Sequence, residues 1–95
     1  SDIVMSHRIL YRFLKDVLAL SEERAEEIAC EMEHAVDREA IERFCCFLAF
    51  INRSEERRLS WIEEFRTFIR EGFQGKSCKE CIKEYIEALP AETEG

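Results

Sequence analysis

SEERAEEIACEMEHAV, residues 21–36, is the stretch of sequence that decides the fold. Ser21 and the two glutamates after it indicate a helix start, because a serine hydroxyl accepts a hydrogen bond from an unpaired backbone amide and carboxylates favour the positive helix end. Small and apolar residues then recur at helical spacing, which predicts a helix to about Val36 with a face that another helix can approach closely. This face consists of Ala25, Ile28, Ala29 and Met32.

Segments with helical periodicity lie on both sides of this stretch. The first has no convincing cap at its start, which indicates the end of a helix that begins farther upstream. Asp37 and Ser54 are predicted caps of later helices, and Gly72 and Pro90 are predicted stops. We therefore expect an all-α fold of about five helices, over residues 5–18, 21–36, 38–51, 54–72 and 78–89.

The composition supports one small helical domain. The chain has 95 residues, of which 46% are hydrophobic, with three glycines and one proline. That is enough for one modest core and leaves few places for hairpins. We expect a single domain over residues 1–90 and a flexible tail over residues 91–95.

The charge and hydropathy patterns argue against direct binding to DNA and against a membrane-spanning segment. Fourteen basic and 21 acidic side chains leave a net charge of -7, so the chain lacks the cationic surface that direct binding to DNA requires. No apolar run approaches the roughly 20 residues of a membrane span, and the N-terminus has no signal-peptide pattern. We expect a cytoplasmic protein with no membrane partner.

A polar row on the predicted second helix carries the chemistry. Glu26, Cys30, Glu33 and His34 are spaced i, i+4, i+7 and i+8, which places them on one helical face. Thiolate, carboxylate and imidazole together suit Fe(II), Zn(II), Co(II) or Ni(II) better than magnesium or calcium. Such a row also arises by chance, because a cysteine beside a helix stripe is often core filler. His7, the other histidine, favours the metal, since it lies on the neighbouring helix.

The segments HRILYRFL, residues 7–14, and ACEMEH, residues 29–34, carry a family resemblance. In order and spacing, residues 5–48 resemble the second domain of iron-dependent, diphtheria-toxin-repressor-like regulators. The resemblance implies a small helical dimerisation domain that follows an N-terminal winged-helix DNA-binding domain, which this chain lacks. It implies a homodimer that contacts DNA only through that missing domain.

The resemblance also implies two metal sites. Cys30, Glu33 and His34 correspond to the primary site, which a residue of the missing domain completes, and His7 corresponds to a ligand of an ancillary site. Two positions depart from the family pattern, because Tyr11 stands where iron-type members have a glutamate and Glu26 where they have a histidine. Glu26 is therefore expected to join His7 in an altered ancillary site. Manganese-type relatives have a glutamate at the Cys30 position, so the cysteine favours Fe(II), with Mn(II) as a further candidate.

The function that follows is a metal-sensing and homodimerisation domain of a transcriptional repressor. Fe(II)-like metal binding would promote operator binding by the missing domain, with no catalysis and no small-molecule substrate. The predicted helix over residues 38–51 is apolar on most sides, and a partner subunit is the natural cover for its second face. We expect Phe44, Phe47 and Phe50 at the dimer interface.

The remaining cysteines leave alternatives open. Cys78 and Cys81 form a C-x-x-C pair at a helix start, which is typical of a redox pair or half of a zinc site. Cys45 and Cys46 point about 100° apart on their helix and are expected in the core. The alternative functions are a dimerisation module with an incomplete metal site and a thiol redox or zinc module. A di-metal enzyme is disfavoured, because only one E-x-x-H, ending at His34, is present.

Overall fold

The computed structural model describes residues 2–91, and the side chains of residues 5–91. Within this part every regular element is helical, apart from one isolated β-bridge, which confirms the all-α fold. No helix in it is both long and apolar enough to cross a membrane. The predicted tail falls almost wholly outside the described residues. The elements are α1 (Asp2–Arg12), η1 (Phe13–Val17), α2 (Glu22–Met32), α3 (Arg38–Asn52), α4 (Glu55–Glu71) and α5 (Cys78–Ala88).

The predicted helix starts are confirmed in their atomic detail. The Ser21 hydroxyl accepts a hydrogen bond from the Arg24 amide at 3.2 Å, and the Asp37 carboxylate accepts one from the Ala40 amide at 2.8 Å. These caps are local, because each involves a side chain and an amide three residues later. They could therefore be predicted without any knowledge of the packing.

The geometry of the first helix and the end of the second differ from the prediction. The first helix changes from α to π geometry at Phe13 and ends before Ala19, whose backbone is left-handed with φ 61°. The α2 helix ends at Met32, four residues earlier than expected, where the amide of Ala35 bonds to the Met32 carbonyl only three residues back, at 2.9 Å, and closes a tighter turn. Glu33 thus caps the helix, and His34 lies in the turn beyond it.

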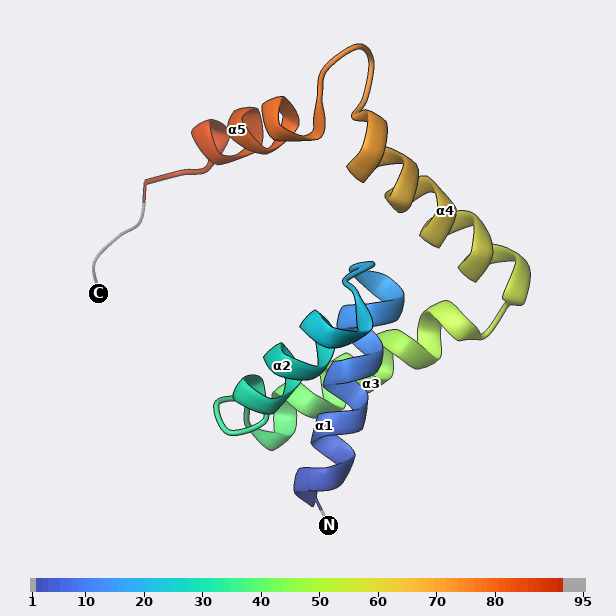
Figure 1. Ribbon diagram of the computed structural model, residues 1–95, viewed down its shortest axis with the longest axis vertical. Helices are drawn as coiled ribbons and strands as arrows, with labels where there is room; N and C mark the ends of the chain where they lie inside the picture. The colour runs from blue at the N-terminus through green and yellow to red at the C-terminus, as the bar shows by residue number, and fades with distance from the viewer. Residues whose placement is uncertain (1, 92–95) are drawn as a thin grey trace. The chain divides into compact units, whose positions relative to one another are not determined.

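The chain forms two compact units, Ser1–Ile62 and Glu63–Gly95. In the first unit α1 packs against both α2 and α3, as Figure 1 shows. The core of this unit joins two leucines of the first helix to two alanines of α2 and one isoleucine of α3. It consists of Leu10, Leu14, Ala25, Ala29 and Ile41. The alanines confirm the predicted close-approach face of α2.

The second face of α3 is not covered by this core. Cys45 and Cys46 are exposed, so their expected place in the core was wrong for the chain by itself. The aromatic Phe47 and Phe50, with side chains 36% and 44% exposed, lie on the same helix. Only the side of α3 that carries Ile41 and Phe44 packs into the core of the first unit.

In the second unit, a tight turn joins the end of α4 to α5. Gly72 has φ 77°, and a Cβ atom there would lie 1.7 Å from the Lys76 carbonyl oxygen, so the position requires glycine. The backbones of Phe73 and Lys76 pair through bonds of 2.9 and 3.0 Å. Ser77 then starts α5 with a reciprocal capping box to Glu80.

Candidate metal centre

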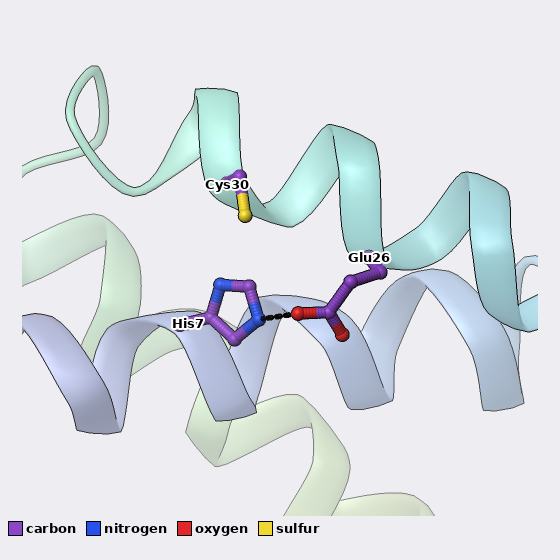
Figure 2. A group of neighbouring side chains, drawn as sticks. All are labelled: His7, Glu26 and Cys30. Atoms are coloured by element: carbon purple, nitrogen blue, oxygen red, sulfur yellow. Dashed lines mark hydrogen bonds and ion pairs between the residues drawn. The ribbon is translucent and has the colours of Figure 1, made fainter.

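The packing of α1 on α2 brings the candidate ligands together. His7 projects from α1, and Glu26 and Cys30 project from α2, as Figure 2 shows. Alanines at positions 25 and 29 let the two helix backbones approach closely, so polar side chains beside the core meet across the helix pair. One potential ligand atom from each of the three residues lies within 4.8 Å of the other two.

His7 is held between two carboxylates. Its Nε2 atom lies 2.6 Å from Oε1 of Glu26, and its Nδ1 atom lies 2.9 Å from Oε2 of Glu33. The side chain of Glu33 is only 13% exposed and that of His7 22%, whereas that of Glu26 is 57% exposed. The carboxylate on Nδ1 is thus the more enclosed of the two.

This arrangement matches the outer support that metal-binding histidines require. Such histidines usually donate the second ring N–H to a carboxylate, which fixes the tautomer and the ring orientation. Glu33 is placed to accept from Nδ1 of His7, which leaves Nε2 directed towards Glu26. The donors of His7, Glu26 and Cys30 supply one nitrogen, one oxygen and one sulfur, a set that fits a borderline transition metal.

Protons compete with a cation for this site. Desolvation by burial lowers the pKa of His7, but hydrogen bonds and charges from Glu26 and Glu33 together outweigh it and raise the pKa above 6.5. Desolvation raises the pKa of the Cys30 thiol, and the charges of Glu33, Glu26 and Glu31 raise it further. A bound cation would reverse this balance, because it favours the thiolate and the neutral imidazole.

The raised pKa of His7 gives a pH-dependent prediction for the metal-free protein. Protonated His7 stabilises the folded state at pH values below 6.5, and this contribution is lost as the pH rises through the higher folded pKa. NMR titration of the His7 ring should give a midpoint above 6.5, and Glu33→Gln should lower it. The matched control is Glu23→Gln, on the same helix. An equal midpoint in all three proteins would contradict the assignment.

The other predicted site residues do not belong to this cluster. The side chain of His34 is 72% exposed, and its Nε2 atom lies 3.6 Å from Oε1 of Glu33. Tyr11, at the position where a glutamate was expected from the resemblance, packs against the core. Cys78 and Cys81 belong to the second unit.

The three predicted interface residues differ in how far they are buried. Phe44 is partly buried and meets Phe13 edge to face, with ring centroids 4.9 Å apart. Phe47 and Phe50 are more exposed, and their ring centroids lie 6.4 Å apart. Phe44 and Phe47 line a groove that is almost wholly apolar, together with Phe13, Val17, Ala40 and Arg43.

One family model matches this chain: iron dependent repressor, metal binding and dimerisation domain, over residues 1–61. The match covers well over half of the chain. The chain belongs to this family. The matched range contains α1, α2, α3 and the start of α4, and therefore the whole candidate metal centre. No curated protein and no solved structure matches the chain.

Membership of the iron-dependent repressor family confirms the resemblance seen in the sequence. The family is one of transcriptional regulators and not a class of enzymes, and metal binding and dimerisation are the two activities that its description names. Residues 62–95 lie outside the match.

Every residue of the cluster was predicted as a metal ligand from the sequence, but the three were assigned to two different sites. Cys30 was placed in one site and His7 with Glu26 in another, whereas the three lie together in the structure. Nothing in the sequence indicated that Glu33 bonds to His7, 26 positions away in the chain. Only the packing of α1 against α2 creates that contact.

Proposed function

We propose that this chain is the metal-sensing and homodimerisation part of a transcriptional repressor that acts in the cytoplasm. The observation that carries the proposal is the cluster of His7, Glu26 and Cys30, which joins two helices through three donors of different chemistry. The family description supports metal binding and dimerisation. Binding to operator DNA would be performed by a winged-helix domain, because this chain has a net charge of -7.

The proposed ion is a divalent transition metal, with Fe(II) as the leading candidate. Magnesium and calcium are disfavoured, because they take oxygen ligands and not thiolates. Fe(II), Mn(II), Co(II), Ni(II) and Zn(II) all accept imidazole and carboxylate ligands. The family description favours iron among these. Three donors leave coordination positions free, and an upstream domain could fill one of them.

In this proposal the residues of the cluster have distinct roles. His7 binds through Nε2, Cys30 through its thiolate and Glu26 through a carboxylate oxygen, while Glu33 orients His7 through Nδ1. Direct binding by Cys30, Glu33 and His34, as the resemblance implies, is the competing ligand set. The ion would supply positive charge that holds the ligands together.

A metal at this place would lock α1 to α2. His7 and Cys30 belong to different helices, so both can bind one ion only while the helices stay paired. An upstream domain joined to α1 would then be held in one orientation. Metal would favour operator binding to the extent that it binds this arrangement more tightly than others.

The proposed dimer uses the uncovered face of α3. Phe47 and Phe50 expose aromatic surface, Phe47 also lines an apolar groove, and a partner copy would remove this surface from water. Phe44 would contribute its exposed edge and also support the core. The association can be measured by sedimentation equilibrium, where a chain that is monomeric at every concentration would contradict this part of the proposal.

The metal site can be tested by thermal unfolding in the presence of different cations. The chain should carry Cys78→Ser and Cys81→Ser, so that these two thiols cannot bind the added cation. Fe(II) or Co(II) at 100 times its Kd should stabilise the fold by about 2.7 kcal/mol, and Mg(II) should have little effect. The further change Cys30→Ser should abolish most of the stabilisation. Equal stabilisation with and without Cys30 would favour a dimerisation module with no functional thiolate site.

A further inference from the structure

The α5 helix has two sharply different faces, and both of its cysteines lie on the apolar one. Cys78 and Cys81 are one turn apart and partly buried. Their face continues along the helix with large apolar side chains that are 50 to 68% exposed, namely Ile82, Tyr85, Ile86 and Leu89. The opposite face is charged throughout and consists of Lys79, Glu80, Lys83, Glu84 and Glu87. Whatever covers the apolar face therefore also meets the thiols.

The start of α5 provides partial positive charge beside both cysteines. Cys78 is the first residue of the helix, and the Cys81 amide bonds to the Ser77 carbonyl at 3.0 Å, so both lie in the positive first turn. Lys76 adds a positive charge. Its pKa is raised mainly by its hydrogen bond to Glu84 and, to a smaller extent, by Cys81, which places the ammonium within electrostatic reach of that sulfur.

The other polar groups at this helix start are already engaged. Glu80 accepts from Ser77 in the capping box, and Glu84 accepts from Lys76 at 2.5 Å. Residues 63–95 contain no histidine and no cysteine besides these two. The second unit can therefore offer a soft metal two thiolates, which is half of a structural zinc site.

We propose that Cys78 and Cys81 of two copies of this chain bind one zinc ion in a tetrathiolate site. A closed structural zinc site takes four ligands, so the pair is incomplete without a second copy. The family description names dimerisation, which supplies that copy. This site differs from the cluster around His7 in its residues and in its compact unit. It rests on the homodimerisation in the proposed function and not on the metal centre proposed there.

Charge and geometry both favour this assembly. Zinc with four thiolates carries two negative charges, which are offset in part by two helix N-termini of about half a positive charge each. The N-termini of the two α5 helices must meet at the zinc, which a parallel pair allows and a side-by-side antiparallel pair does not. In the parallel arrangement, Ile82 and Tyr85 of each copy are buried against the other.

The test uses the full chain with Cys30→Ser, Cys45→Ser and Cys46→Ser, which retains only Cys78 and Cys81. After loading with zinc and removal of the excess, the protein should hold one zinc per two chains. Sedimentation equilibrium should show a dimer at least about tenfold tighter with zinc than after chelation. A further Cys78→Ser change should abolish both effects. One zinc per chain, no retained zinc, or a dimer indifferent to zinc would overturn the proposal.

A second measurement uses the unaltered chain, so that the result does not depend on the folding of a multiple variant. Zinc should protect Cys78 and Cys81 equally from alkylation, read by mass spectrometry of peptides. A different outcome would contradict the zinc site and identify a redox pair. In that outcome zinc gives no protection from alkylation, and glutathione disulfide oxidises Cys78 and Cys81 to an internal disulfide with release of two glutathione thiols.

Discussion

Replacement of Leu10 by alanine is expected to lower the free energy of unfolding by about 3 to 5 kcal/mol. Leu10 is the largest fully buried side chain, with no exposed surface. Its neighbours in the core include Ala25 and Ala29, whose short side chains cannot extend to fill the cavity. Both the transfer term and the cavity term therefore contribute.

The effect of Leu10→Ala should be large relative to the total stability. A unit of about 60 residues has a stability of roughly 3 to 9 kcal/mol, so this change alone approaches unfolding. Denaturation by urea, followed by circular dichroism, gives the measurement. Leu59→Ala is the matched control, because that leucine is 46% exposed, and it should cost less than about 1 kcal/mol. Equal losses in the two variants would contradict the position of the core.

The second large effect is expected for His7→Ala on metal binding. Loss of an outer partner of a metal ligand costs about 10- to 100-fold in affinity, and loss of the ligand itself should cost at least the upper value. His7 is the one residue of the cluster that α1 provides, so its removal also disconnects the two helices. Calorimetric titration with Co(II) should therefore show affinity at least about 100-fold weaker.

His34→Ala is the matched control for His7→Ala, since it also removes an imidazole. Its exposed side chain lies outside the cluster, and the expected change in affinity is less than tenfold. If His34→Ala instead weakened binding more than His7→Ala, the metal would be bound by Cys30, Glu33 and His34. The pair of variants thus separates the two proposed ligand sets.

The features that could be predicted from the sequence are those that local chemistry determines. Ser21 and Asp37 cap helices through amides three residues away, and the alanines of α2 form a close-packing face because of their spacing. The end of α2 could not be predicted in the same way. It depends on a turn closed by the Ala35 amide on the Met32 carbonyl, which removes His34 from the helical row.

The grouping of the site residues is a tertiary property. Helical spacing relates Glu26 to Cys30, but it cannot give the rotation of α1 that directs His7 between Glu26 and Glu33. The prediction that Cys46 lies in the core was wrong for a related reason. A cysteine in an apolar segment is commonly buried, but the core of the first unit needs only one side of α3, and Cys46 lies outside it.

The most direct test of the metal centre is the absorption spectrum of the Co(II) complex. It should be recorded on a chain in which Cys45, Cys46, Cys78 and Cys81 are serine, so that Cys30 is the remaining thiol. We predict one cobalt per chain and a thiolate-to-cobalt charge-transfer band that disappears with Cys30→Ser and weakens strongly with His7→Ala. Absence of the band from the chain that retains Cys30, or its indifference to His7, would contradict a metal bound between α1 and α2.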